Sequence, residues 1–198
     1  MYRFIDSLKV ENGRIFHLPY HLARMNKTLK DFFGDAHFDP ELWINRIKAP
    51  GKGLFKLRLL YSKEPIKAEF IPYQPKTWKT LRLVHTDSLQ YGYKYADRSG
   101  LQKLFEQRGP CDDILIVHQG LITDASSCNV VFFDGKVWVT PAQPLLPGTC
   151  RQRLLDEGMI IKRDIPVEDI RNYQKVRLIN AFYDLEEAQE VEMKNVVG

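Results

Sequence analysis

The fold is decided by a stretch that reads Ile114-Leu-Ile-Val-His118-Gln-Gly120, Leu121-Ile-Thr-Asp124-Ala-Ser-Ser-Cys128, Asn129-Val-Val-Phe-Phe133-Asp-Gly135, Lys136-Val-Trp-Val-Thr140 and Pro147-Gly-Thr-Cys-Arg151. Short apolar runs bounded by Gly, Asp and Asn predict strands joined by tight turns. The Pro-Gly pair predicts the start of a helix that runs through Leu155. Small polar residues between strands, next to a helix N-terminus, can bind an anion and a polar ring. We interpret the stretch as a site for pyridoxal phosphate (PLP).

Two lobes are expected on either side of a short linker. The linker runs from Pro72 to Lys79 and is polar and rich in turn residues. The expected fold is α/β, with a small α+β lobe over residues 1–73 and a larger lobe over 79–198. The other expected elements are strands 2–10 and 14–18 around an Asn12-Gly13 turn, helices 19–33, 41–47 and 97–108, strands 53–61, 68–73, 80–84, 159–163, 176–179 and 188–191, and a short helix over 167–172, with 193–198 unassigned.

Composition and charge exclude several classes of protein. The 198 residues are 44% hydrophobic and 27% charged, which is ordinary for a globular protein with an apolar core. The net charge of +4 comes from dispersed basic residues, which suits an anionic ligand and does not indicate a nucleic-acid surface. No signal peptide and no apolar run near the roughly 20 residues that span a bilayer are present. Three cysteines without metal spacing predict reduced thiols, so we expect a cytoplasmic protein without membrane association.

Lys94 and Asp124 offer the chemistry that a PLP site needs. Lys94 lies among aromatic residues in Tyr91-Gly-Tyr-Lys-Tyr95, and such neighbours help to withdraw a Schiff-base lysine from water. Asp124 precedes small polar residues that include Ser126, and its carboxylate could pair with a protonated pyridine nitrogen. Each residue also has a plainer interpretation, which is a solvated loop lysine for the first and the cap of an Asx turn for the second.

Two groups could bind a phosphate. The backbone N–H groups of Thr149 and Cys150 lie at the start of the predicted helix, where donors lack a partner within the helix. Arg24 lies beside the apolar stripe of the 19–33 helix. An ordinary helix start and a solvated arginine are the alternatives. His17 and His21 show no metal-ligand spacing, and no Walker, Rossmann or Gly-x-Ser-x-Gly motif is present, so no metal site is predicted.

Taken together, five segments resemble class IV aminotransferases, the fold-type IV PLP enzymes that include branched-chain and D-amino-acid aminotransferases and aminodeoxychorismate lyase. The likeness runs over nearly the whole chain, and the order of the segments makes it specific although each one alone is weak. The segments are Asn12-Gly13 with His21-Leu-Ala-Arg24-Met25, Tyr93-Lys-Tyr-Ala-Asp97-Arg98, Leu121-Ile-Thr-Asp124-Ala-Ser-Ser-Cys-Asn129-Val-Val-Phe132, Thr140-Pro141 with Leu146-Pro-Gly148 and Arg151, and Leu178-Ile-Asn180-Ala181.

The resemblance implies a role for each matching residue. Lys94 would form the Schiff base with PLP and would then move the α-proton of the substrate. Asp124 would keep the ring nitrogen protonated. Arg58 is a candidate for binding the substrate carboxylate, and a plain salt bridge is its alternative. The cofactor-binding residues implied in this way are Arg24, Lys94, Asp124, Ser126, Thr149, Cys150 and Asn180.

The chain departs from the family pattern at three points. Asp124 stands where Glu is usual, Cys150 stands where Thr or Ser is common, and the fold is expected to be shortened at its N-terminus by a strand and a turn. The implied function is transamination of an amino acid or an amino-containing acid, by a homodimer of amino-acid metabolism. A lyase of the aminodeoxychorismate type, which expels pyruvate, is one alternative. A non-catalytic descendant that keeps the fold as a ligand-binding module is the other.

Overall fold

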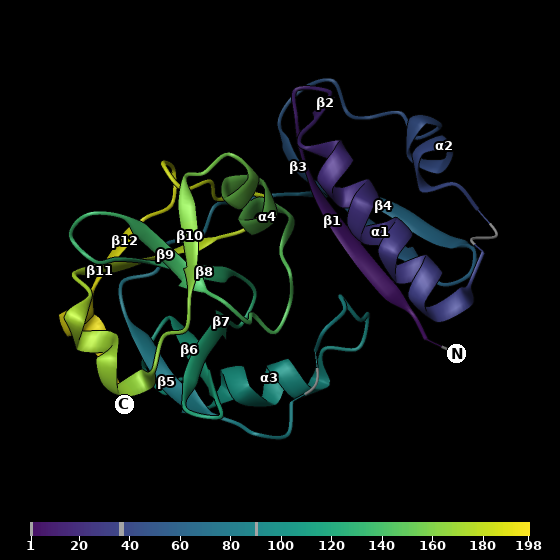
Figure 1. The fold of residues 1–198 in the computed structure, drawn as a ribbon. Helices are drawn as coiled ribbons and strands as arrows, with labels where there is room; N and C mark the ends of the chain where they lie inside the picture. Colours follow the sequence, from purple (N-terminus) through teal and green to yellow (C-terminus); the bar gives the residue numbers. More distant parts are fainter. Residues whose placement is uncertain (1, 36–37, 90) are drawn as a thin grey trace. The chain divides into compact units, whose positions relative to one another are not determined.

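The computed structural model describes residues 2–35, 38–89 and 91–198 (Figure 1). Contacts between residues divide the chain into two compact units. The N-terminal unit comprises Met1–Pro75 and also Tyr93–Asp97, whereas the C-terminal unit comprises Lys76–Gly92 and Arg98–Gly198. The segment that carries Lys94 thus belongs to the N-terminal unit, although the sequence analysis placed it in the lobe over 79–198.

The N-terminal unit is a four-stranded antiparallel sheet in the order β2-β1-β3-β4 with two helices (Figure 1). The predicted turn is confirmed, because Asn12 and Gly13 both have positive φ and join β1 to β2 as a two-residue hairpin. The return strand is much shorter than the predicted 14–18, since His17 and Leu18 already begin the first helix. The elements are β1 (Phe4–Glu11), β2 (Arg14–Ile15), α1 (Leu18–Phe33), α2 (Pro40–Asn45), β3 (Leu54–Tyr61) and β4 (Pro65–Pro72).

The core of this unit lies between the sheet and α1. Alternate residues of β1 point to one face of a strand, and Phe4, Leu8 and Val10 are fully buried in one hydrophobic cluster with Met25 of α1. Asp6 occupies the same row and is fully buried as well. A carboxylate at such a position is costly unless a cation compensates it, so Asp6 must find its partner within this core.

One edge of β1 receives the segment that carries Lys94. β1 pairs with β3 along its whole length, but it pairs with β2 only at Val10 and Glu11. Over the remaining part of that edge, the N–H of Ile5 donates to the carbonyl of Lys94 at 2.9 Å, and the N–H of Ala96 donates to the carbonyl of Arg3 at 2.9 Å. These backbone bonds explain why Tyr93–Asp97 groups with the N-terminal unit.

The C-terminal unit is built on a nine-stranded mixed sheet. Its strands follow the order β10-β9-β8-β7-β6-β5-β13, and β11 pairs with β8 and β12. The β5–β6, β5–β13 and β9–β10 pairs are parallel. The elements are β5 (Leu81–His85), α3 (Ser99–Glu106), β6 (Asp113–His118), β7 (Leu121–Ala125), β8 (Asn129–Phe133), β9 (Trp138–Pro141), α4 (Thr149–Asp156), β10 (Ile160–Arg163), β11 (Lys175–Ile179), β12 (Glu190–Glu192) and β13 (Val196–Val197), with 3₁₀ helices η1 (Val167–Asn172) and η2 (Met193–Asn195).

The expected α/β class is confirmed, and the largest difference lies at the C-terminal end. Residues 193–198 received no assignment, yet they contain β13, which extends the sheet beside β5. Arg171 holds this strand by donating to the carbonyls of Met193 and Val196. A two-residue strand has too little sequence to show a pattern, which is why its long-range partner was not foreseen. Within the described residues, no helix is long and apolar enough to cross a membrane.

Candidate active site

Asp124 lies buried at the end of β7 and binds two elements together. The N–H of Ala125 donates to the carbonyl of Cys128 at 2.9 Å, which closes the turn between β7 and β8 and brings Asn129 opposite Asp124. The side-chain amide of Asn129 donates to Asp124 Oδ1 at 2.5 Å and to the carbonyl of Leu146 at 2.8 Å. The N–H of Leu146 donates to Asp124 Oδ2 at 3.0 Å. The carboxyl and the amide therefore hold both backbone polar groups of Leu146.

Gly148 continues this loop and leaves no room for a side chain. A Cβ at this position would lie 1.9 Å from Asn129 Oδ1, which is far inside a van der Waals contact. The helix α4 begins directly afterwards at Thr149, and no side chain of the described residues caps its first turn. Asp124 and Asn129 thus fix the N-terminus of α4, where an anion can take the place of a cap.

Arg151 anchors the other side of the same helix. Its side chain is buried, its Nε donates to Thr140 Oγ1 at 3.1 Å, and its Nη2 donates to the carbonyl of Pro141 at 2.7 Å. Thr140 Oγ1 in turn donates to the carbonyl of Val130 at 3.0 Å, so α4 is tied to both β8 and β9. These bonds assign Arg151 a supporting role in the C-terminal unit.

The protonation state of Asp124 is unusual. Burial raises the pKa of its carboxyl to about 7, and the hydrogen bonds from Leu146 and Asn129 offset only part of this rise. The charge of Arg151 lowers the pKa of Asp124 by less still. Near neutral pH the carboxyl therefore holds a proton for much of the time. A cation placed against it would favour the ionised form, as the predicted pyridinium contact requires.

Cys150 and Asn180 are joined through the backbone of Tyr183. Cys150 Sγ lies 3.7 Å from the carbonyl of Tyr183, whose backbone also exchanges two hydrogen bonds with Asn180. The side-chain amide of Asn180 lies 3.1 Å from Cys128 Sγ, at the start of β8. Burial raises the pKa of Cys150 to about 12, so its thiol stays protonated and is no nucleophile.

Ser126 stands slightly apart from these residues, in the turn between β7 and β8. Its N–H lies 3.2 Å from Asp113 Oδ1, and its carbonyl accepts a hydrogen bond from Arg98 at 2.8 Å. Its side chain is half-buried. Four of the residues predicted for the C-terminal unit are thus connected through their neighbours: Asp124, Thr149, Cys150 and Asn180. The connecting residues are Asn129, Gly148, Tyr183 and Cys128. Ser126 follows Asp124 closely in the chain.

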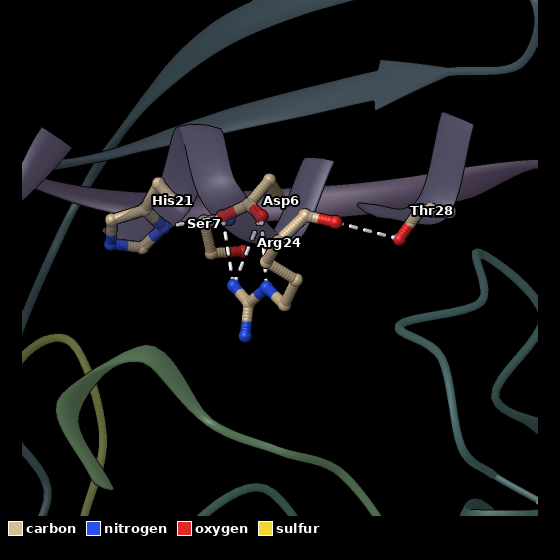
Figure 2. A network of polar contacts seen from close by, with 5 residues as sticks. All are labelled: Asp6, Ser7, His21, Arg24 and Thr28. Atoms are coloured by element: carbon tan, nitrogen blue, oxygen red, sulfur yellow. Dashed lines mark hydrogen bonds and ion pairs between the residues drawn. The ribbon is translucent and has the colours of Figure 1, made fainter. Parts of the chain in front are cut away.

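Arg24 belongs to a polar network in the N-terminal unit, which Figure 2 shows from close by. Its Nε donates to Asp6 Oδ2 at 3.1 Å, and its Nη2 donates to Asp6 Oδ1 and Oδ2 at 2.9 and 3.0 Å. His21 Nδ1 lies 2.6 Å from Asp6 Oδ1, and the N–H of Ser7 donates to the same oxygen at 2.7 Å. Neither Asp6 nor His21 was predicted from the sequence as a site residue. An acidic residue in the inward row of a strand is the signal that could have found them.

The titration of this network follows from its charges. Burial is the largest single influence and raises the pKa of Asp6, but the interactions with Arg24 and His21 together outweigh it and hold this pKa well below its usual range. Burial lowers the pKa of His21, so the ring is neutral at pH 7. Because an ionised carboxylate only accepts hydrogen bonds, the Nδ1 of His21 must carry the proton that binds Asp6.

Lys94 is half-buried and lies near the same network. Its positive charge is one of the influences that lower the pKa of His21, after burial and alongside Arg24. The structure therefore brings Lys94 and Arg24 into one neighbourhood of the N-terminal unit. Arg58, on β3 of that unit, donates to Glu69 of β4 at 2.9 Å, which is the plain salt bridge that the sequence left open. Its predicted contact with a substrate carboxylate stays a prediction.

Comparisons with known proteins identify the family. Residues 3–185 match the family described as amino-transferase class IV. An uncharacterized protein of Haemophilus influenzae is 37% identical over 188 residues, which cover 93% of this chain and all of the relative. The crystal structure of a putative 4-amino-4-deoxychorismate lyase from Haemophilus somnus is 34% identical, with a TM-score of 0.86 over 93% of this chain and 98% of that one. A hypothetical aminotransferase from Mycobacterium tuberculosis, solved in a PLP-bound form, has the same fold, with a TM-score of 0.73 at 18% identity over 96% of this chain and 80% of that one.

The chain belongs to the class IV aminotransferase family, which is PLP-dependent. The residues described above suit this cofactor. The C-terminal unit offers a buried carboxyl for a ring nitrogen and an uncapped helix N-terminus, and the N-terminal unit offers an amine on Lys94 and a guanidinium on Arg24. Among the described residues, no group of three or more His, Cys, Asp or Glu side chains is placed to hold a metal ion.

The contact between Gly148 and Asn129 gives the first prediction. Gly148→Ala should push Asn129 away from Asp124 and shift the start of α4, which should destabilise the protein by about 1–3 kcal/mol and weaken PLP binding. The free energy of unfolding in urea and a PLP titration measure the two effects. Gly51→Ala is the matched control, because no atom lies within 4 Å of the added Cβ. Equal effects of the two substitutions would contradict the assignment of Gly148.

The raised pKa of Asp124 gives the second prediction, for the protein without PLP. In the unfolded chain an Asp carboxyl has a pKa of about 3.9. Between that value and about 7 the folded state binds more protons than the unfolded state, so stability should fall as the pH rises. The full loss by pH 8 should be on the order of 4 kcal/mol. Urea unfolding from pH 5 to 8 should show about 2.6 kcal/mol of this loss, because the rest falls below pH 5.

Asp124→Asn should remove this fall with pH, because an amide cannot ionise. Asp156→Asn changes an exposed carboxylate on α4 and should leave the pH dependence as it is. If wild type and Asp124→Asn show the same slope of stability against pH, Asp124 is ionised in the free protein and the assigned direction is wrong.

Proposed function

We propose that this protein is a PLP-dependent enzyme that acts at the α-carbon of an amino acid or an amino-containing acid by transamination. The observation that supports this most directly is the buried carboxyl of Asp124, which also positions the N-terminus of α4 through Leu146. When bound, PLP supplies an electron sink that stabilises negative charge at the α-carbon of a substrate.

Each candidate residue has a defined task in this proposal. The Nζ of Lys94 holds the cofactor and, once the substrate has displaced it, carries the proton to and from the α-carbon. Asp124 holds the proton of the ring nitrogen in place. The backbone N–H groups of Thr149 and Cys150, together with Arg24, bind the phosphate.

The proposal extends to the edges of the site. Ser126 and Asn180 would help to hold the cofactor, and Arg58 would exchange Glu69 for the carboxylate of the substrate. The Arg58–Glu69 pair is about a third exposed at both side chains, so a substrate can compete for the guanidinium at little cost.

A lyase that releases pyruvate is the second candidate function. It is favoured by the relative at 34% identity, which is named as a putative 4-amino-4-deoxychorismate lyase. Both reactions begin with removal of a proton from the α-carbon, so Lys94 and Asp124 keep the same tasks in either. They differ in the fate of the amino group, because a transaminase needs an oxo-acid acceptor and a lyase does not.

The third prediction tests the shared proton step. Protein loaded with PLP should exchange the α-proton of at least one amino acid for deuterium in heavy water, as followed by NMR over a panel of substrates. Lys94→Ala should abolish the exchange, because no other group is assigned to move the proton. Asp124→Ala should slow it by at least about tenfold, since a charge-assisted hydrogen bond is worth about 1.5–3 kcal/mol. Asp156→Asn should exchange as fast as wild type.

Substrate choice separates the two reactions in the same assay. Exchange that leads to a new amino acid only when an oxo acid is added supports transamination. Release of pyruvate from 4-amino-4-deoxychorismate without an oxo acid supports the lyase. Bound PLP with no exchange from any substrate would contradict both and would favour a non-catalytic ligand-binding module.

A further inference from the structure

Asp6 is a charged residue in the inward-facing row of β1, where apolar side chains are expected. Its neighbours in the inward row, Phe4 and Leu8, are fully buried, and Asp6 is itself 0% exposed. A buried ion pair adds little to stability over an apolar replacement of similar volume. Removal of one partner, however, leaves a buried charge without compensation and costs several kcal/mol of stability. The pair with Arg24 therefore needs an explanation beyond stability.

Both oxygens of the Asp6 carboxylate accept hydrogen bonds from the protein. Arg24 contacts both oxygens, and Oδ1 also accepts from His21 Nδ1 and from the backbone N–H of Ser7. His21 and Arg24 lie three residues apart on α1, so they project from one face of the helix. With these partners the carboxylate has one orientation, and it fixes the orientation of the guanidinium in turn.

Arg24 binds Asp6 through the Nε–Nη2 edge of its guanidinium group. The Nε and Nη2 atoms donate to the carboxylate, whereas the third nitrogen, Nη1, points away from it in Figure 2. The side chain of Arg24 is 15% exposed although that of Asp6 is fully buried, so the guanidinium lies at the border of the core. One edge of the planar fork is thus held by Asp6, and its other end points away from that carboxylate (Figure 2).

A fixed guanidinium end suits a phosphate. Arg binds phosphate oxygens through a planar set of donors, and less conformational entropy is lost when the fork is already oriented. The charge of Lys94 also acts on His21, which places the amine proposed to hold the cofactor near the same network. We propose that Asp6 and His21 are positioning residues that orient Arg24, so that Nη1 is presented to the phosphate of PLP. This inference rests on the proposed function, and it assigns Asp6 and His21 a part in phosphate recognition.

The test compares two ligands that differ only in the phosphate. The dissociation constants of PLP and of pyridoxal are measured for the PLP-free protein, and their ratio reports phosphate recognition alone. Wild type should prefer PLP. Asp6→Asn and Arg24→Gln should each reduce this preference by roughly tenfold or more and leave the affinity for pyridoxal nearly unchanged. The double variant should be little worse than either single one, because both changes remove one interaction.

Two further sets of variants keep the test decisive. Asp39→Asn makes the same chemical change in the same unit, where Asn still caps α2, and it should keep the wild-type ratio.

If Asp6→Asn does not fold, His21→Phe and His21→Asn serve instead, because an asparagine amide can replace the Nδ1 donor and a phenyl ring cannot. The preference for PLP should fall in His21→Phe and be retained in His21→Asn.

The outcomes separate this inference from the proposed function. If Arg24→Gln loses the preference but Asp6→Asn and His21→Phe keep it, Arg24 binds phosphate without help and the inference is wrong. If Asp6→Asn weakens PLP and pyridoxal equally, Asp6 is merely structural and the inference is again wrong. If wild type itself does not prefer PLP, the assignment of Arg24 in the proposed function fails, and the inference fails with it.

Discussion

The burial of Asp6 is the constraint on which the N-terminal unit depends. The charge of a carboxylate in the inward row of β1 must be compensated within the core. Arg24 and His21 provide this compensation, because they lie on α1 directly opposite Asp6. This pairing fixes how far along β1 the helix lies, because a shift by one turn would leave the charge of Asp6 without its partner. The apolar contacts of Met25 and Leu29 are compatible with that same position.

Two buried carboxyls in this chain titrate in opposite directions, and the reason is the charge of their partners. Asp6 has a guanidinium at hydrogen-bonding distance and stays ionised. Asp124 receives hydrogen bonds from an amide and a backbone N–H, both neutral, and it holds a proton near pH 7. The first is complete as a salt bridge, whereas no cation among the described residues donates a hydrogen bond to the second, and the charge of Arg151 has the smallest effect on its pKa. A protonated ring nitrogen would supply that missing charge.

Local features of the fold could be predicted from the sequence. Asn12-Gly13 specifies its own hairpin, Asp39 caps α2 through Glu41 and Leu42, and the Asn129–Phe133 run is a strand with the predicted bounds. Features that depend on distant pairing could not be predicted. The Lys94 segment completes an edge of β1 from nearly ninety residues away, and β13 is recognisable only beside β5. A short helix was predicted over residues 167–172 without its type, and the structure shows a 3₁₀ helix there.

The candidate site shows the same division. Lys94, Arg24 and Asp124 could be named because they lie in segments that resemble a known family. Asp6 and His21 were missed, because a single Asp in a strand is usually on the outward face, and only the place of Asp6 in the apolar row of Phe4 and Leu8 indicates that it is buried. The clamp formed by Asn129 on Leu146 was not visible either, since it joins residues that the sequence separates by a hairpin.

The central claim is that Lys94 binds PLP covalently, and chemical trapping tests it most directly. Reduction of the PLP-loaded protein with borohydride, followed by proteolysis and mass spectrometry, locates the lysine that carries the pyridoxyl group. We expect one modified peptide, with the label on Lys94, and none after Lys94→Ala. A label on another lysine, or no label at saturating PLP, would contradict it.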